Sequence, residues 1–253
     1  MEAAAAPPPP PPAPSNESRL TVGGVINEAI DLYGKHVGVL LGAAAIVFIV
    51  AGVIQGILTD DHGIWLRLVA SIVGLVASTL FTGFVVTLVA DVRDGKQDSS
   101  VGEMMSSASH AILRLIGNGI LGGIAIGIGF VLLIVPGLYL LTIWAVAAPA
   151  IVAERRGVIE AFGRSYELVR GHGWTVFGAI VVAFLILIAV GIVFAIIGAA
   201  IGDLAGRIIF TIIANILVAP FPALVASVLF FGLGGSSPAV GRDAVVPSAA
   251  PAT

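Results

Sequence analysis

The chain has 253 residues, of which 58% are hydrophobic and 11% charged, and its formal net charge is −3. An ordinary soluble domain is about 45–50% apolar and about 25% charged, so this composition excludes a typical water-soluble fold. The absence of cysteine excludes disulfides and thiolate sites, and the acidic balance argues against nucleic-acid binding.

The two ends of the chain are predicted to be disordered cytoplasmic tails. Residues 1–18 are rich in alanine and proline, a composition that forms an extended tether and builds no core. Glu2 and Glu17 stand where a secretory signal would carry basic residues, so the first apolar block is expected to stay in the membrane. Residues 234–253 have a similar composition and are predicted to form the second tail.

The apolar residues between the tails form blocks of about twenty or more, the length of a helix that crosses roughly 30 Å of hydrocarbon. They do not alternate with polar residues as membrane strands do, so we predict an all-α polytopic membrane bundle over residues 19–233. Six transmembrane helices are expected, at residues 37–58, 64–90, 116–135, 137–153, 173–200 and 205–233.

Proline marks the least regular of these predicted spans. The Pro136–Gly137 pair is either a tight hairpin turn between two short spans or a kink in one long span. The length of residues 116–153 favours the hairpin. Pro149, Pro220 and Pro222 fall within predicted spans, where each is expected to kink or interrupt a helix.

Lysine and arginine set the predicted orientation. In the six-span arrangement ten of these residues share one side, and only Arg67 and Arg207 lie on the other. Basic residues near membrane spans are retained in the cytoplasm. Both termini are therefore expected in the cytoplasm, and the turn at Asp60–Gly63 is expected outside.

A threefold internal pattern places an amphipathic stretch before each pair of spans. The stretches begin near Val22, Val101 and Val158, and each gathers apolar side chains on one helical face. Each copy is predicted to be a cytoplasmic interfacial helix, with its apolar face in the headgroup layer, followed by a two-helix hairpin. The alternative is a juxtamembrane linker that tertiary contacts stiffen.

The most distinctive stretch runs from the Pro136–Gly137 pair through Pro149 and Glu154–Arg155 to the segment Glu160–Gly171 and Trp174. It resembles the six-span membrane domain attached to some glycerophosphoryl diester phosphodiesterases and the related YciC-like inner-membrane proteins of bacteria. The resemblance implies a helical domain in the bacterial inner membrane. It implies no activity, because the family has no settled one and no soluble phosphodiesterase domain is present in this sequence.

The predicted spans contain almost no ionisable side chains, which argues against catalysis or ion coupling inside the membrane. Gln55, Asn118 and Asn215 are the most polar side chains in or near the spans, and we expect them to form interhelical hydrogen bonds. No two histidines have metal-ligand spacing such as HExxH. We therefore expect no catalytic residue, no cofactor, no metal site and no enzyme activity.

The third amphipathic stretch carries the candidate site, which is a set of predicted contacts with anionic lipid headgroups. Its members, four of them arginines within sixteen residues, are Arg155, Arg156, Arg164, Arg170 and Trp174. The alternative is that the arginines only fix topology and pair with Glu154, Glu160 and Glu167.

The predicted function is that of a non-enzymatic inner-membrane protein that organises or assists other membrane components. Its expected partners are membrane lipids and either another membrane protein or a second copy of the chain. Two alternatives stay open: a small transporter or channel for a lipid-like or apolar solute, and a membrane accessory unit of a lipid-metabolising enzyme. A transporter must move solute in liposomes, whereas an accessory unit must co-purify with its enzyme.

Overall fold

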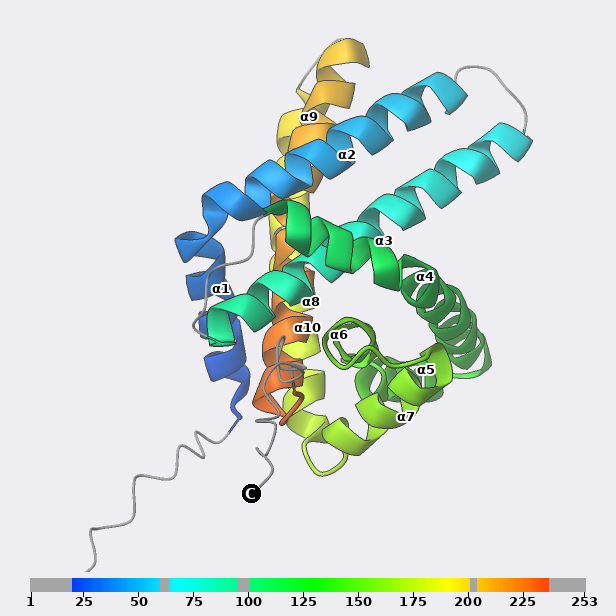
Figure 1. The fold of residues 1–253 in the computed structure, drawn as a ribbon. Helices are drawn as coiled ribbons and strands as arrows, with labels where there is room; N and C mark the ends of the chain where they lie inside the picture. The colour runs from blue at the N-terminus through cyan, green and yellow to red at the C-terminus, as the bar shows by residue number, and fades with distance from the viewer. Residues whose placement is uncertain (1–19, 60–63, 95–100, 201–203, 237–253) are drawn as a thin grey trace, which may run out of the picture.

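The computed structural model describes residues 20–59, 64–94, 101–200 and 204–236. Within these ranges the chain forms ten α-helices and no strand (Figure 1). The predicted tail at residues 1–18, most of the tail at 234–253 and the turn at Asp60–Gly63 lie outside the described residues. The helices are α1 (Val22–Lys35), α2 (Val37–Thr59), α3 (Ile64–Asp94), α4 (Val101–Leu132), α5 (Ile134–Ile143), α6 (Ala147–Ala153), α7 (Val158–Val169), α8 (Gly173–Ala199), α9 (Leu204–Val218) and α10 (Pro220–Gly232).

Six helical stretches in the described part of the chain are long and apolar enough to cross a membrane. This confirms the predicted fold class, an all-α bundle with six candidate membrane-spanning helices. The fourth and sixth stretches are each built from two helices, α5 with α6 and α9 with α10. The stretches are Val37–Gln55, Val69–Asp94, Gly102–Leu132, Ile134–Ala153, Gly173–Ala199 and Ile212–Gly232.

Three helix breaks each follow from a proline, namely Pro136, Pro149 or Pro222. A proline removes the hydrogen bond to the residue four positions earlier, and its ring clashes with that residue's carbonyl. Each of these earlier residues lies at a break: Leu132 ends α4, Ala145 lies between α5 and α6, and Val218 ends α9. The expectation that prolines interrupt the spans is therefore confirmed, and the predicted span at 205–233 consists of the two helices α9 and α10.

The break between α4 and α5 is centred on Leu133, not on the Pro136–Gly137 pair. Leu133 has an extended backbone with φ −162° and ψ 148°. Pro136 fits the first turn of α5, because its missing N–H has no helical partner there. A Cβ on Gly129 would lie 3.0 Å from the Cα of Gly137, so α4 and α5 lie against each other and the chain reverses direction at Leu133.

The second amphipathic stretch is not a separate helix, which corrects the prediction for residues 101–115. Helix α4 runs without a break through this stretch and the predicted third span. By contrast, α1 ends at Lys35 with His36 as its C-cap, and α7 ends at Val169 with Arg170 as its C-cap, before Gly171 with φ +92°. Leu115 matches His36 in the repeat and is 3% exposed, so it packs in the core and the helix continues.

The apolar faces of α1 and α7 contact protein. Val25, Ile26 and Ala29 of α1 are buried, and α1 packs against α8 and α10. Phe162 and Leu168 of α7 are also buried, and α7 packs against α4 and α6. Such contacts with other helices are what the alternative of a juxtamembrane linker stiffened by tertiary contacts requires. The position of α1 and α7 relative to a lipid surface stays a prediction.

The core lies where α3, α6 and α10 meet. Phe81 of α3, Ile151 of α6, and Leu224 and Phe230 of α10 are at most 1% exposed. Phe48 of α2 packs edge-on against Phe81, with 5.5 Å between the ring centroids. Helices α2 and α3 run side by side in Figure 1 and extend away from this core.

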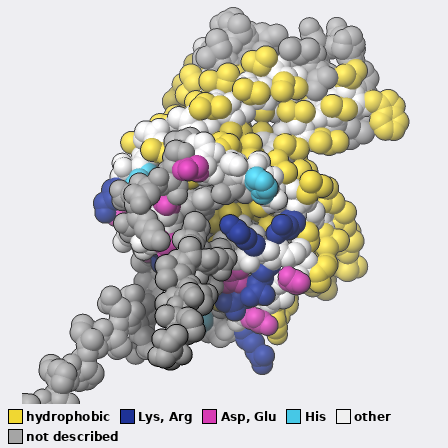
Figure 2. Space-filling model, viewed as in Figure 1, with side chains coloured by type: hydrophobic (Ala, Val, Ile, Leu, Met, Phe, Trp, Pro, Cys, Tyr) yellow, Lys and Arg dark blue, Asp and Glu magenta, His cyan; other side chains and the backbone are white. Residues whose placement is uncertain are grey.

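Both ends of the described chain lie at the same end of the bundle. Gly232, the last residue of α10, packs directly against Leu20, and Arg93 at the end of α3 pairs with Glu28 of α1. The guanidinium of Arg93 also lies 5.5 Å from the ring centroid of Phe231. In Figure 2 charged side chains gather in the lower part of the view, while hydrophobic side chains cover the upper and right parts. The bundle therefore has a charged end, where the chain enters and leaves.

Candidate functional site at the junction of α6 and α7

Glu154 is the charged centre of the junction between α6 and α7. Its side chain is 6% exposed, and its carboxylate accepts hydrogen bonds from Arg156 Nε at 2.5 Å and from Arg164 Nε at 3.1 Å. The backbone N–H of Ser236, which follows α10, also donates to this carboxylate at 3.3 Å. One carboxylate thereby connects α6, α7 and the start of the predicted C-terminal tail.

The hydrogen bonds at the junction keep Glu154 ionised. Burial raises the pKa of this carboxyl group, but hydrogen bonds from Arg156, the Ser236 amide and Arg164 together outweigh burial and lower the pKa below its ordinary value. The hydrogen bond to Glu154 raises the pKa of Arg156. The junction therefore holds its charges at neutral pH.

Ser165 of α7 closes the helix break between α5 and α6. Its hydroxyl donates to the carbonyl of Ile143 at 2.8 Å and accepts from the N–H of Val146 at 3.3 Å. Ser165 is fully buried, so no water replaces these partners, and a buried backbone group without a partner is costly. The Phe162 ring packs against Trp144 in the same break, with 4.6 Å between centroids. Helix α7 is thus fixed to the break by a hydroxyl and an aromatic contact.

Arg155 lies in the short connection between α6 and α7. Its φ is +54°, a backbone conformation that is uncommon for residues other than glycine. Its carbonyl accepts a hydrogen bond from Arg114 Nη1 of α4 at 2.9 Å. Its side chain is exposed. The backbone of Arg155 is therefore held by α4, while the residue stays exposed to the surroundings.

Arg170 and Trp174 lie at the other end of α7. Arg170 follows the last residue of α7 and is exposed, and Trp174 is 86% exposed. The twelve residues of α7 cover about 18 Å, so Arg155 and Arg170 mark opposite ends of this helix. The predicted site thus divides into two parts. Arg156 and Arg164 are paired at the junction, while Arg155, Arg170 and Trp174 form an exposed rim.

The three glutamates named as alternative partners of the arginines have different roles. Glu154 binds two arginines, whereas Glu167 lies 3.7 Å from Arg164 and is 70% exposed. Glu160 accepts the backbone N–H of Gly157 at 3.2 Å and so caps the start of α7. Glu154 therefore differs from the other two glutamates both in its burial and in its two arginine partners.

Sequence reasoning missed the role of Ser165, although a signal for it exists. Ser165 lies four residues after Ala161 and three after Phe162, so all three share one helical face. The structure buries this face. A polar side chain on an otherwise apolar face indicates a buried hydrogen-bond partner, which here is the backbone of the α5–α6 break.

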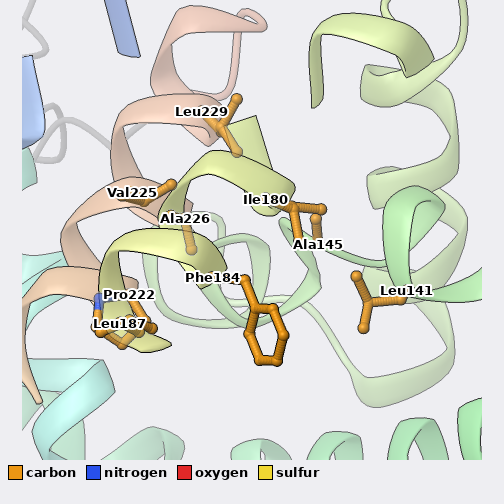
Figure 3. A pocket seen from close by; sticks show the side chains of 10 residues that line it. Leu141, Ala145, Ile180, Phe184, Leu187, Pro222, Val225, Ala226 and Leu229 are labelled. Carbon is orange, nitrogen blue, oxygen red and sulfur yellow. The ribbon is translucent and has the colours of Figure 1, made fainter. Parts of the chain in front are cut away.

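An apolar cavity of about 300 Å³ lies between α5, α8 and α10 (Figure 3). Leu141 of α5 lies across from Ile180 and Phe184 of α8, and Pro222 and Leu229 belong to α10. All ten lining residues are hydrophobic. Such a cavity has no polar group to orient a polar substrate, so it suits a hydrocarbon.

A second cavity of about 240 Å³ adjoins the break between α9 and α10. Its lining includes Leu217 and Val218 of α9, Phe221 of α10 and Tyr33 of α1. The Tyr33 hydroxyl donates to the carbonyl of Leu217 at 2.9 Å, and burial raises the pKa of this tyrosine. Both cavities therefore border the helix break associated with Pro222.

The polar side chains of the predicted spans take part in helix packing. A Cβ on Gly74 would lie 3.4 Å from the amide of Gln55, so Gln55 packs between α2 and α3. The prediction of an interhelical hydrogen bond is wrong for the Asn118 side-chain oxygen, which is buried and has no hydrogen-bond partner among the described residues. Over those same residues, no group of three or more His, Cys, Asp or Glu side chains is placed to hold a metal ion.

The comparisons with known proteins identify a family. Residues 40–221 match the family described as Uncharacterised protein family (UPF0259). No curated protein and no solved structure matches the chain. The match gives no link to glycerophosphoryl diester phosphodiesterases. It covers more than half of the chain, from α2 to the start of α10, and includes the α6–α7 junction. The chain therefore belongs to the UPF0259 family.

Proposed function

We propose that this chain is a non-enzymatic integral membrane protein that organises or assists other membrane components and binds anionic lipid at its charged end. The exposure of Arg155 and Arg170 at the two ends of α7 carries the proposal. A basic residue near an anionic membrane surface contributes about 1 kcal/mol to binding. The exposed Trp174 adds a side chain that favours the membrane interface.

The balance of charge around α7 supports this proposal. Five arginines, including Arg114 of α4, lie with three glutamates in this part of the chain, which leaves two positive charges in excess. Arg156 and Arg164 share the buried carboxylate of Glu154. The exposed rim is thus positive although the whole chain is acidic, and an anionic headgroup is complementary to it.

A lipid-competition measurement tests the headgroup proposal. The purified protein is equilibrated with equal amounts of phosphatidylglycerol and phosphatidylcholine, and bound lipids are counted by native mass spectrometry. The variant Arg155→Gln/Arg170→Gln should lower the anionic-to-zwitterionic ratio by up to about 30-fold, which corresponds to about 1 kcal/mol per charge. The control Lys35→Gln removes an exposed cation that is paired with Asp31 at 2.7 Å. An unchanged ratio in the double variant, or an equal fall in the control, contradicts the proposal.

We further propose that the chain lies in the bacterial inner membrane with both termini in the cytoplasm. The bias of ten basic residues to two supports this orientation. The packing of Gly232 against Leu20 supports an even number of crossings, because it brings both ends of the described chain together.

Cysteine labelling in intact cells tests this topology at the α4–α5 turn. Gly137 is a poor position, because a Cβ there would lie 2.5 Å from the Phe130 ring, whereas Leu133 is 67% exposed. An impermeant thiol reagent should label Leu133→Cys from outside and leave Gly157→Cys unlabelled. Tyr139 of α5 and Trp174 at the start of α8 line one groove, so the first turns of α5 lie near the end of α8 that is expected on the cytoplasmic side. The crossing of the membrane by α5 is therefore the part of this topology that the labelling tests most strictly. Labelling of both cysteines or of neither rejects it.

The second candidate function is transport of a lipid-like or apolar solute. The two apolar cavities that border the α9–α10 break favour it, because broken helices commonly surround solute sites in transporters. Reconstituted protein should then accelerate movement of a fluorescent phospholipid across liposomes. Filling the cavity of Figure 3 with Ala226→Phe should abolish that acceleration. No acceleration by the unaltered protein rejects this candidate.

The third candidate is a membrane accessory unit of a lipid-metabolising enzyme, related to the membrane domain of glycerophosphoryl diester phosphodiesterases. The open face of α4 favours a partner helix, because Cβ atoms on Gly123 and Gly127 would meet nothing within 4 Å. Cross-linked protein should then co-purify with such an enzyme, and Gly123→Leu should weaken this association. Recovery of the chain without any lipid enzyme contradicts this candidate.

A further inference from the structure

A groove of about 520 Å³ lies between α5 and the first turns of α8. Its lining includes Leu138 and Tyr139 of α5, and Gly173, Trp174 and Phe177 of α8. The groove is distinct from the cavity in Figure 3, but α5 and α8 contribute to both. Neither the junction around Glu154 nor the proposed headgroup contacts explain it.

One face of α8 borders both the groove and the cavity. Gly173 and Phe177 line the groove, and Ile180, Phe184 and Leu187 line the cavity. Steps of four, three, four and three residues keep these five positions on one helical face, which we call the α8 track. The track rises about 21 Å, and the hydrocarbon of one leaflet is about 15 Å thick. The part of the track from Gly173 to Phe184 rises about 16 Å, so an acyl chain of one leaflet reaches along it as far as Phe184.

The chemistry of the track is that of a hydrocarbon contact. Thr142 also lines the groove, but its hydroxyl already donates to the carbonyl of Leu138 at 2.7 Å. The cavity that continues the track is lined by hydrophobic residues throughout. Helix α8 belongs to a candidate membrane span, so lipid chains are the solvent available to it.

The end of the groove near the start of α8 is aromatic, and a cationic residue adjoins it in the sequence. Gly171, with φ +92°, lines the groove and turns the chain from α7 into α8. The residue before it is the exposed Arg170. Trp174 and Tyr139 border the same groove and are 86% and 55% exposed. A cation beside interfacial aromatic residues complements a phosphate group and the glycerol region beneath it.

We propose that the groove and the α8 track bind one acyl chain of an anionic phospholipid, whose phosphate group lies at Arg170. The glycerol region then lies beside Trp174, and the chain passes Tyr139 as it follows α8 toward Phe184. This inference rests on the proposed lipid-binding function and assigns it one site. Arg155, at the other end of α7, serves a separate headgroup position.

The test uses phosphatidylglycerol with a photoreactive diazirine in the middle of one acyl chain, and phosphatidylcholine with the same group. Each lipid is added to vesicles that contain the full chain, and cross-linked peptides are mapped by mass spectrometry. The blocking variant is Gly173→Leu, because Gly173 lines the groove, a Cβ there meets nothing within 4 Å, and a leucine side chain adds bulk at this position. The matched control is Gly123→Leu, an equally open glycine on α4 that does not line the groove.

In the unaltered protein, cross-links from phosphatidylglycerol should concentrate on residues 138–142 and 173–184. Exposed Ile124 and Ile128 of α4 report background contact with bulk lipid. Gly173→Leu should reduce the groove cross-links at least about tenfold, and Gly123→Leu should leave them unchanged. The distribution of cross-links in the unaltered protein tests the acyl-chain site without any variant. It therefore decides the question even if Gly173→Leu fails to fold.

Two results overturn the inference. Cross-links spread evenly over the groove and α4 reject the acyl-chain site, and the ratio measured for the double arginine variant then decides the proposed function independently. Cross-links that concentrate in the groove equally for both lipids reject the selection of an anionic phospholipid by Arg170.

Discussion

Four arginines of equal charge in and beside α7 occupy two regions with different environments. At the junction, Arg156 and Arg164 bind a carboxylate that is 6% exposed. At the rim, Arg155 and Arg170 have exposed side chains. The difference shows that the number of basic residues in a stretch does not give the charge available to a ligand, because one buried acid sequesters two of them.

The largest loss of stability is expected when α7 loses the buried hydroxyl of Ser165. Ser165→Ala leaves the Ile143 carbonyl and the Val146 N–H without their partner, at a cost of about 3 kcal/mol. Ser227 is equally buried, but its hydroxyl bonds only the Ala223 carbonyl of its own helix at 2.7 Å. Ser227→Ala should therefore cost less than about 1 kcal/mol. Thermal unfolding in detergent compares the two, and equal losses contradict the role given to Ser165.

A smaller loss is expected when the junction loses its acid. Glu154→Gln leaves Arg156 and Arg164 without a charged partner, and we expect it to cost about 2 kcal/mol, because these arginines retain partial exposure. The control Glu167→Gln removes a carboxylate that is 70% exposed and should change stability by less than about 0.5 kcal/mol. Chemical unfolding of both variants measures this difference. A junction variant as stable as the control would show that Glu154 is not its centre.

The spans follow from the sequence because block length and proline position act locally. The blocks predict the six membrane helices, and Pro149 and Pro222 predict breaks that the structure places four residues upstream. The role of Glu154 does not follow locally, because Arg164 and Ser236 approach it from ten and 82 residues away. The continuity of α4 was missed for the same reason: Leu115 extends the helix through burial in the core.

After the losses expected for Ser165→Ala and Glu154→Gln, the smallest effect on stability is the pH dependence of the contribution of Glu154. The pKa of Glu154 is lowered in the folded protein, so its stabilisation is fully present above the ordinary carboxyl pKa. It is lost as pH falls through the lowered pKa of the folded protein. The difference in melting temperature between the unaltered protein and Glu154→Gln should therefore shrink between pH 6 and pH 3. A difference that is constant across this range contradicts the assignment.

The most direct test of the division between junction and rim compares two single arginine variants. The anionic-to-zwitterionic lipid ratio is measured by native mass spectrometry for Arg164→Gln and Arg170→Gln, each at a matched folded fraction. Arg170→Gln should lower the ratio about fivefold, the value of one exposed charge near 1 kcal/mol, and Arg164→Gln should leave it unchanged. An equal fall in both variants, or a fall in Arg164→Gln alone, contradicts the account.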